Sequence, residues 1–212
     1  MTKLDFEQLP LLDNKRPLLC QLGDHRTITL QKFNNVFERA HCALYFIAKF
    51  HSESNGIIKK ALLRASIAEF VSIEEVVKVD LKINSISADP LLIRKTENPL
   101  LHIIKQLRNY NIHLGSTILD YAEETTRIFG TEEDLANGTG YKYSDKEVII
   151  TNLSISEFNK LKDANKYCDK DKLCIIDWFN LNQIRWGVGH LIYLAILDYC
   201  DRIISFYELT KK

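Results

Sequence analysis

The most constraining feature of this 212-residue sequence is its last segment, Ile175 to Leu209. Its apolar side chains surround the predicted helix instead of lining one side. They are Trp186, Leu191, Ile192, Leu194, Ile196, Leu197, Ile203, Ile204 and Phe206. A helix that is apolar all round must be covered on every side, in the middle of a bundle or at a subunit interface. The segment therefore predicts a multi-helix core built around the C-terminal helix.

Three earlier segments have the periodicity of amphipathic helices. Apolar residues recur at helical spacing over 29–51, and the cluster of turn-forming residues that follows predicts the end of this helix. A second helix is expected over 57–82. A third is expected over 98–120, because Asn98 is a good N-cap and Pro99 suits the first helical position.

The stretch 130–172 has a different pattern. A turn signal lies at 137–140, residues 147–150 could form a short strand, and Ser154 or Ser156 could cap a short helix that runs through Ala164. We therefore predict an all-α, up-and-down helical bundle with one irregular insertion at 130–172. The bundle is expected to be a single domain over 29–212, preceded by a lead-in over 1–28.

Composition excludes some classes of function. Lys plus Arg and Asp plus Glu both number 28, so the net charge is zero, which argues against coating nucleic acid or membrane by bulk electrostatics. No signal peptide is recognised, and no apolar run approaches the roughly 20 residues that span a bilayer. Five cysteines without a CxxC pair favour reduced thiols. We therefore expect a cytoplasmic protein that makes no membrane contact.

The candidate site is a short polar motif on the third predicted helix, Arg108-Asn109-Tyr110-Asn111-Ile112-His113. In a helical projection, Arg108 and His113 flank the side opposite the apolar stripe. The polar side chains between them are Asn109, His102, Lys105 and Ser116. Five residues correspond to ~140° of rotation and ~7.5 Å of rise, so the two side chains diverge on a regular helix. A homodimer that places two such faces around one cleft, or a kink at the motif, would bring them together. The alternative is an ordinary solvated helix face.

The Arg-x4-His arrangement, with a polar residue directly after the Arg and late in an all-α bundle, resembles the HEPN superfamily. The preceding helix, 61–75, is similar to the second helix of that superfamily, where an acidic residue often supports the Arg. The resemblance implies a metal-independent endoribonuclease in which Arg108 and His113 are catalytic. Asn109, Glu69 and His102 would be supporting residues. It also implies a homodimeric toxin or phage-defence effector that acts on RNA and is controlled by a partner such as a nucleotidyltransferase-like antitoxin.

These residue types suit RNA cleavage without a metal or another cofactor. The 2′-OH of RNA can attack the adjacent phosphate. A histidine, with an unperturbed pKa of about 6.5, can accept the proton of the 2′-OH or donate one to the departing 5′-oxygen. Arginine supplies a permanent positive charge to the transition state. The expected products are a 2′,3′-cyclic phosphate and a 5′-hydroxyl, and DNA should resist cleavage. Lys59, Lys60 and Arg64 are either surface charges or additional phosphate contacts.

Two alternatives stay open. A second Arg-x4-His pair, Arg185 and His190, has Trp after the Arg and two glycines inside the motif. His190 shares a face with Leu194 and Leu197, which favours a hydrogen-bonded core histidine, so this pair is the alternative catalytic one. The alternative function is a non-catalytic helical dimerisation or adaptor module, or a module that binds RNA or nucleotides without cleaving them. The six histidines and five cysteines predict no metal site.

Overall fold

The computed structural model describes residues 3–7, 22–83, 85–113, 117–122, 125–129, 131–145, 147–161 and 163–210. The longer helices are α1 (Asp24–Leu30), α2 (Asn34–Ser52), α3 (Gly56–Lys82), α4 (Pro99–His113), α7 (Asp169–Trp186) and α8 (Val188–Thr210). The short helices are α5 (Glu132–Ala136), α6 (Ile155–Asn159), η1 (Asp89–Leu91), η2 (Ile93–Lys95) and η3 (Ala164–Lys166). The strands are β1 (Leu119–Tyr121), β2 (Thr125–Phe129), β3 (Tyr141–Asp145) and β4 (Val148–Ile150). The prediction of an all-α helical bundle is confirmed.

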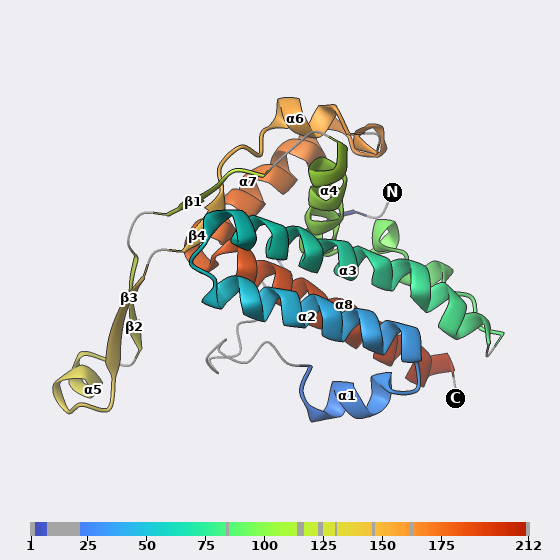
Figure 1. Ribbon diagram of the computed structural model, residues 1–212, viewed down its shortest axis with the longest axis horizontal. Helices are drawn as coiled ribbons and strands as arrows, with labels where there is room; N and C mark the ends of the chain where they lie inside the picture. Colours follow the sequence, from blue (N-terminus) through green and yellow to red (C-terminus); the bar gives the residue numbers. More distant parts are fainter. Residues whose placement is uncertain are drawn as a thin grey trace.

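Helix α8 is the central helix of the bundle (Figure 1). It packs against α1, α2, α3, α4 and α7. Its buried residues are Val188, Gly189, Leu191, Ile192, Ala195, Ile196, Tyr199, Cys200, Ile203, Ile204 and Tyr207. The predicted burial is confirmed for one broad side of α8, whereas Leu194 and Leu197 are half-buried, Leu209 is exposed, and the segment 175–209 is not one helix. Gly187, with φ +80°, separates α7 from α8.

Helices α2 and α3 form an antiparallel hairpin over α8 (Figure 1). The Asn55 side chain caps α3 by accepting from the N–H groups of Ile57 (2.9 Å) and Ile58 (3.2 Å). At the other end of the hairpin, the Asp80 carboxylate accepts from the N–H of Val36 (3.0 Å) in the first turn of α2. A carboxylate at that place offsets the partial positive charge of the helix N-terminus. The hairpin is therefore fixed at both ends.

The N-terminal lead-in is partly helical. A helix was expected to start at Thr29, but α1 begins at Asp24 and a new helix, α2, begins at Asn34. The Arg26 guanidinium donates two hydrogen bonds of 2.7 Å to the Asp201 carboxylate, which fixes α1 on α8. Residues 8–21 of the predicted lead-in lie outside the described residues.

The irregular segment begins earlier than residue 130. Helix α4 ends at His113 instead of near Asp120, because the chain then enters β1, which pairs antiparallel with β4 from Leu119↔Ile150 to Tyr121↔Val148. Between these strands, β2 and β3 pair antiparallel and, with α5, project from the helical body (Figure 1). The buried Gln183 amide exchanges hydrogen bonds with the N–H (2.8 Å) and C=O (2.9 Å) of Ile150 and so attaches β4 to α7.

Two local predictions inside this segment are confirmed, one of them in part. The expected strand at 147–150 is β4, which spans 148–150. Ser154 is the N-cap of a short helix, since its hydroxyl accepts from the N–H of Glu157 (3.3 Å). That helix, α6, ends at Asn159 rather than at Ala164, which begins the separate turn η3. None of the described helices combines the length and apolar character that a bilayer crossing requires.

Gly187→Ala tests the junction of α7 and α8. The positive φ strains any residue with a Cβ, and an added Cβ would lie 2.3 Å from Glu147 Oε2. We expect a loss of about 1–3 kcal/mol in the free energy of unfolding, measured by urea titration. Gly56→Ala is the matched control, because nothing lies within 4 Å of its added Cβ. It should leave stability unchanged or raise it by up to about 1 kcal/mol. Equal effects of the two substitutions would contradict a strained junction.

Candidate functional site

The predicted motif lies in the last turns of α4. Arg108 and Asn109 are both half-buried, and Arg108 Nη1 donates to Asn109 Oδ1 over 3.4 Å. Arg108 forms no ion pair with any carboxylate that the structure describes. The backbone is α-helical through His113, the last residue of α4, whose side chain lies outside the described residues. The motif therefore presents an un-neutralised guanidinium beside an amide.

The polar side of α4 is narrower than the helical projection predicted. Helix α4 packs against α3, α6, α7 and α8. As a result, Leu101, His102 and Gln106 are buried in addition to the apolar residues Leu100, Ile103, Ile104 and Leu107. Between Pro99 and Tyr110, the half-buried positions are Lys105, Arg108 and Asn109. Between Pro99 and Tyr110, burial on several sides therefore leaves a polar strip of these three residues.

His102 does not line a cleft, and that expectation is corrected. Its ring is fully buried between two partners: Nε2 donates to the Thr96 carbonyl (3.0 Å), and Nδ1 accepts from the Tyr167 hydroxyl (2.9 Å). The carbonyl can only accept, so the ring carries its proton on Nε2. Burial lowers the pKa of His102, and burial raises the pKa of Tyr167 to about 12. The neutral imidazole and the protonated phenol are therefore structural groups.

Glu69 is not joined to Arg108. Its carboxylate accepts a hydrogen bond of 3.0 Å from Arg39 on α2, so it links the two helices of the hairpin. The carboxylate that reaches α4 is Glu74, which is buried, accepts from the N–H of Ile93 (2.8 Å) and forms an ion pair with Lys105. Glu74 therefore fixes α4 against α3.

The second Arg-x4-His pair spans the junction of α7 and α8. The Arg185 guanidinium is exposed and lies 4.7 Å from the centre of the Trp186 ring, a cation–π contact. The His190 ring is half-buried between Trp186 and Tyr193, with ring centroids 6.3 and 6.0 Å away. The helix break at Gly187 places Arg185 and His190 on different helices. They are not on one regular helix face.

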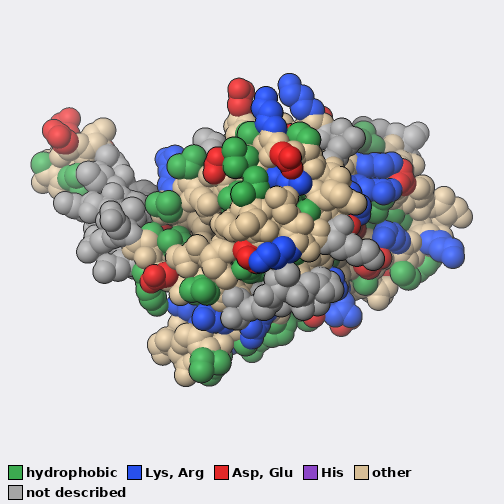
Figure 2. Space-filling view, turned by 90° about the horizontal axis from the view of Figure 1, so that it is seen from above, with side chains coloured by type: hydrophobic (Ala, Val, Ile, Leu, Met, Phe, Trp, Pro, Cys, Tyr) green, Lys and Arg blue, Asp and Glu red, His purple; other side chains and the backbone are tan. Residues whose placement is uncertain are grey.

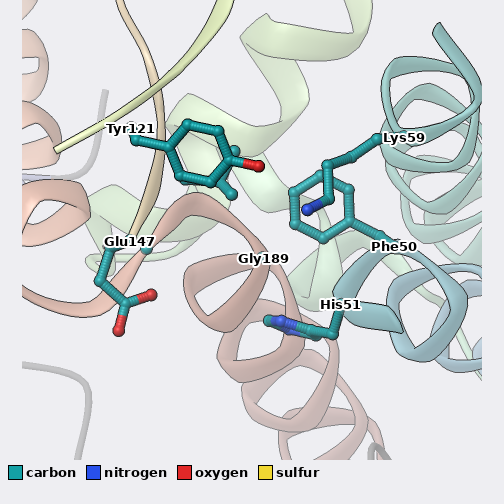
Figure 3. Close-up of a pocket in the computed structure, with 8 residues that line it drawn as sticks. Phe50, His51, Lys59, Tyr121, Glu147 and Gly189 are labelled. Carbon is teal, nitrogen blue, oxygen red and sulfur yellow. The ribbon is translucent and has the colours of Figure 1, made fainter. Parts of the chain in front are cut away.

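A hollow of about 180 Å3 lies beside this junction (Figure 3). Its lining residues come from α2, α3, β1, the start of β4 and the α7–α8 junction. They are Phe50, His51, Lys59, Tyr121, Glu147, Val148, Gly187 and Gly189. Sequence analysis missed this hollow, because its residues come from segments far apart in the chain. The two glycines inside the second motif were the only signal of a close approach.

The hollow contains opposite charges and aromatic rings. Lys59 Nζ lies 5.3 Å from the centre of the Phe50 ring and 5.9 Å from that of Tyr121. Figure 3 shows the Glu147 carboxylate on the opposite side from Lys59. His51 is exposed, although the groups that line the hollow cover part of its ring. Burial of that part, and secondarily the charge of Lys59, lower its pKa, so it is neutral near pH 7.

The surface shows no single basic face in the view of Figure 2. Lys and Arg side chains are scattered there among Asp and Glu side chains. Among the described residues, no group of three His, Cys, Asp or Glu side chains could hold a metal ion. Chemistry at either motif would therefore depend on a few local side chains.

Glu74→Ala tests the link between α3 and α4. The substitution removes the partner of Lys105 and of the Ile93 N–H, and we expect a loss of about 3–5 kcal/mol in the free energy of unfolding. The neighbouring Glu75→Ala is the control, because the Glu75 side chain is 68% exposed and forms a surface pair with Lys78. It should cost less than about 1 kcal/mol. Similar losses in both variants, measured by denaturant titration, would refute the buried link.

His102 predicts a dependence of stability on pH. Its pKa is lower in the folded protein than in the unfolded chain, so the unfolded chain binds more protons and stability falls as pH drops below about 6.5. His102→Ala should be destabilised at pH 7.5 by about 2–4 kcal/mol. It should also lose less stability than the wild type between pH 7.5 and 5.5. His41→Ala, at an exposed position of α2, should keep the wild-type loss. An unchanged pH dependence in His102→Ala would show that this ring does not contribute.

Comparison with known proteins assigns this chain to no family, so a functional assignment depends on the geometry of the two motifs and the hollow. That geometry has three features. Arg108 has no carboxylate partner among the described residues, Arg185 lies on the Trp186 ring, and a small polar hollow lies beside the α7–α8 junction. No family model, no curated protein and no solved structure matches this chain.

Proposed function

We propose that the protein is a metal-independent endoribonuclease that uses Arg108 and His113. The observation that carries this proposal is the half-buried Arg108 guanidinium beside Asn109, without an ion-pair partner among the described carboxylates. By contrast, Arg26 is paired with Asp201 and Arg39 with Glu69. A fixed positive charge that no carboxylate neutralises is available to a phosphate.

The reaction needs no group beyond those of the chain and the RNA. His113 would accept the proton of the 2′-OH as that oxygen attacks the adjacent phosphorus, and the bond to the 5′-oxygen would break. A histidine would then return a proton to the departing 5′-oxygen. Arg108 would stabilise the extra negative charge on the phosphate oxygens, and Asn109 would hold the guanidinium. The products are a 2′,3′-cyclic phosphate and a 5′-hydroxyl.

The continuity of α4 favours a dimeric site. Because α4 is one helix from Pro99 to His113, the backbone positions of Arg108 and His113 lie ~140° apart around its axis. Two copies related by a two-fold axis could place the Arg108 of one chain near the His113 of the other. The resemblance to the HEPN superfamily supports a role as a toxin or phage-defence effector held inactive by a protein partner.

The first test is cleavage of total tRNA and of a long transcript by the purified full chain in excess EDTA. We expect cyclic-phosphate ends, and a loss of at least about 100-fold in rate in Arg108→Ala and His113→Ala. Arg94→Ala and His41→Ala, at exposed positions outside the motif, should keep the wild-type rate. DNA of the same sequence should stay intact.

Each other outcome has a defined meaning. Cleavage that survives in Arg108→Ala but is lost in Arg185→Ala and His190→Ala would move the site to the α7–α8 junction. Absence of cleavage by a folded wild type would refute the nuclease and favour an adaptor or binding module. A mixture of Arg108→Ala and His113→Ala chains should regain activity if the two residues act across a dimer. A mixture as inactive as its components would refute the shared site.

A further inference from the structure

The hollow beside the α7–α8 junction is separate in sequence from the Arg108 motif and remains to be explained. Its volume of about 180 Å3 lies below the about 300–1,000 Å3 of pockets that enclose drug-sized ligands. A group the size of a single base fits such a space better than a whole cofactor does. The strand that supplies Tyr121, β1, begins six residues after α4 ends.

The aromatic side chain at the rim is exposed. Tyr121 is 56% exposed, and in Figure 3 its hydroxyl points across the hollow towards Lys59. An exposed ring beside a base-sized space is a stacking platform, since every base has a face that can stack on an aromatic side chain. The buried Phe50 and the half-buried Val148 close the apolar part of the hollow.

The cation in the hollow is Lys59. It lies over the Phe50 and Tyr121 rings and forms no ion pair with a carboxylate that the structure describes. An ammonium group in this position can bind a phosphate as a point charge. His51 is neutral near pH 7, so it offers one donor and one acceptor but little charge. Lys59 is therefore the group of the hollow whose charge suits a phosphate.

The opposite side of the hollow selects for hydrogen-bond donors. The Glu147 carboxylate lies against the backbone of Gly187, where a Cβ would come within 2.3 Å of Oε2. Glu147 already interacts with another group of the protein, but a carboxylate has about four acceptor sites. It can therefore accept from the amino group of a base, as acidic side chains accept from cytosine N4. Adenine, cytosine and guanine carry such a group, whereas uracil does not.

The glycines of the second motif form the wall of the hollow. A Cβ on Gly189 would lie 2.7 Å from the Phe50 ring and 2.8 Å from the His51 ring, closer than side chains pack. The absence of side chains at Gly187 and Gly189 lets Glu147 and His51 approach the α7–α8 junction. This packing gives a physical role to the two glycines that distinguish the second Arg-x4-His pair from the first.

We propose that this hollow binds one nucleotide, with an amino-bearing base stacked on Tyr121 and contacted by Glu147 and with its phosphate at Lys59. The inference deepens the proposed ribonuclease function and rests on it for the source of the nucleotide, an RNA chain. It would make the hollow a subsite that selects the base at one position of the substrate.

The test is binding of fluorescent 2′-O-methyl dodecamers of A, C and U, measured by anisotropy. These oligonucleotides cannot be cut by attack of a 2′-OH, so binding is separated from cleavage. We expect the A and C dodecamers to bind at least about 10-fold tighter than the U dodecamer. Tyr121→Ala and Lys59→Ala should each weaken binding of the A dodecamer by at least about 10-fold. Glu147→Gln should bring the A and U affinities within about threefold of each other.

Two matched variants control for general effects. Tyr45 on α2 is 58% exposed and has Lys49 5.7 Å from its ring centre, so Tyr45→Ala removes a similar tyrosine that does not line the hollow. Lys82→Ala removes the same charge from an exposed position at the other end of α3. Both variants should bind the A dodecamer like the wild type. Losses equal to those of Tyr121→Ala and Lys59→Ala would overturn the proposal, as would equal affinity of the wild type for A and U.

Failure of this subsite and failure of the nuclease give different results. Cleavage that depends on Arg108, with binding indifferent to Tyr121 and Lys59, would overturn only the subsite. Base-selective binding that depends on Tyr121 and Lys59, without any cleavage, would support the subsite and refute the nuclease. Competition with AMP identifies the source: an RNA chain if the A dodecamer binds at least about 10-fold tighter, a free nucleotide if AMP binds as tightly.

Discussion

Burial of α8 on several sides is the constraint on which the rest of the structure depends. A helix with apolar residues around its circumference is stable in water only when other helices cover it. Helices α1, α2, α3, α4 and α7 supply that cover. The polar links then fix the arrangement, with Arg26 bound to Asp201 of α8 and Glu74 joining α3 to α4. The positions of all candidate site residues follow from this packing.

The ends of the helices are where polar side chains can meet. The middle parts of the surrounding helices pack against α8. The hollow therefore lies at the helix ends, between the α2–α3 turn and the junction at Gly187. The β1–β4 pair closes this end, because Gln183 attaches β4 to α7. The strands therefore bring Tyr121 and Glu147 to the helix ends.

The two Arg-x4-His pairs have the same spacing but different surroundings. Arg108 lies on a continuous helix beside an amide, whereas Arg185 stacks on Trp186 and is separated from His190 by a helix break. The same spacing along a sequence gives a defined distance and direction between two side chains only when the backbone between them is known. With a net charge of zero, nucleic-acid binding would depend on local groups such as Arg108 and Lys59.

The sequence by itself determined the helical class, the burial of much of the last segment, the presence of two helices within 34–82 and the start of α4 at Asn98 and Pro99. These features depend on local periodicity and capping, which neighbouring residues specify. Tertiary structure alone decided the early end of α4, the burial of His102, the pairing of Glu69 with Arg39 and the hollow. Each of these depends on contacts between segments far apart in the chain, and a pattern along one segment contains no information about which other segment will cover it.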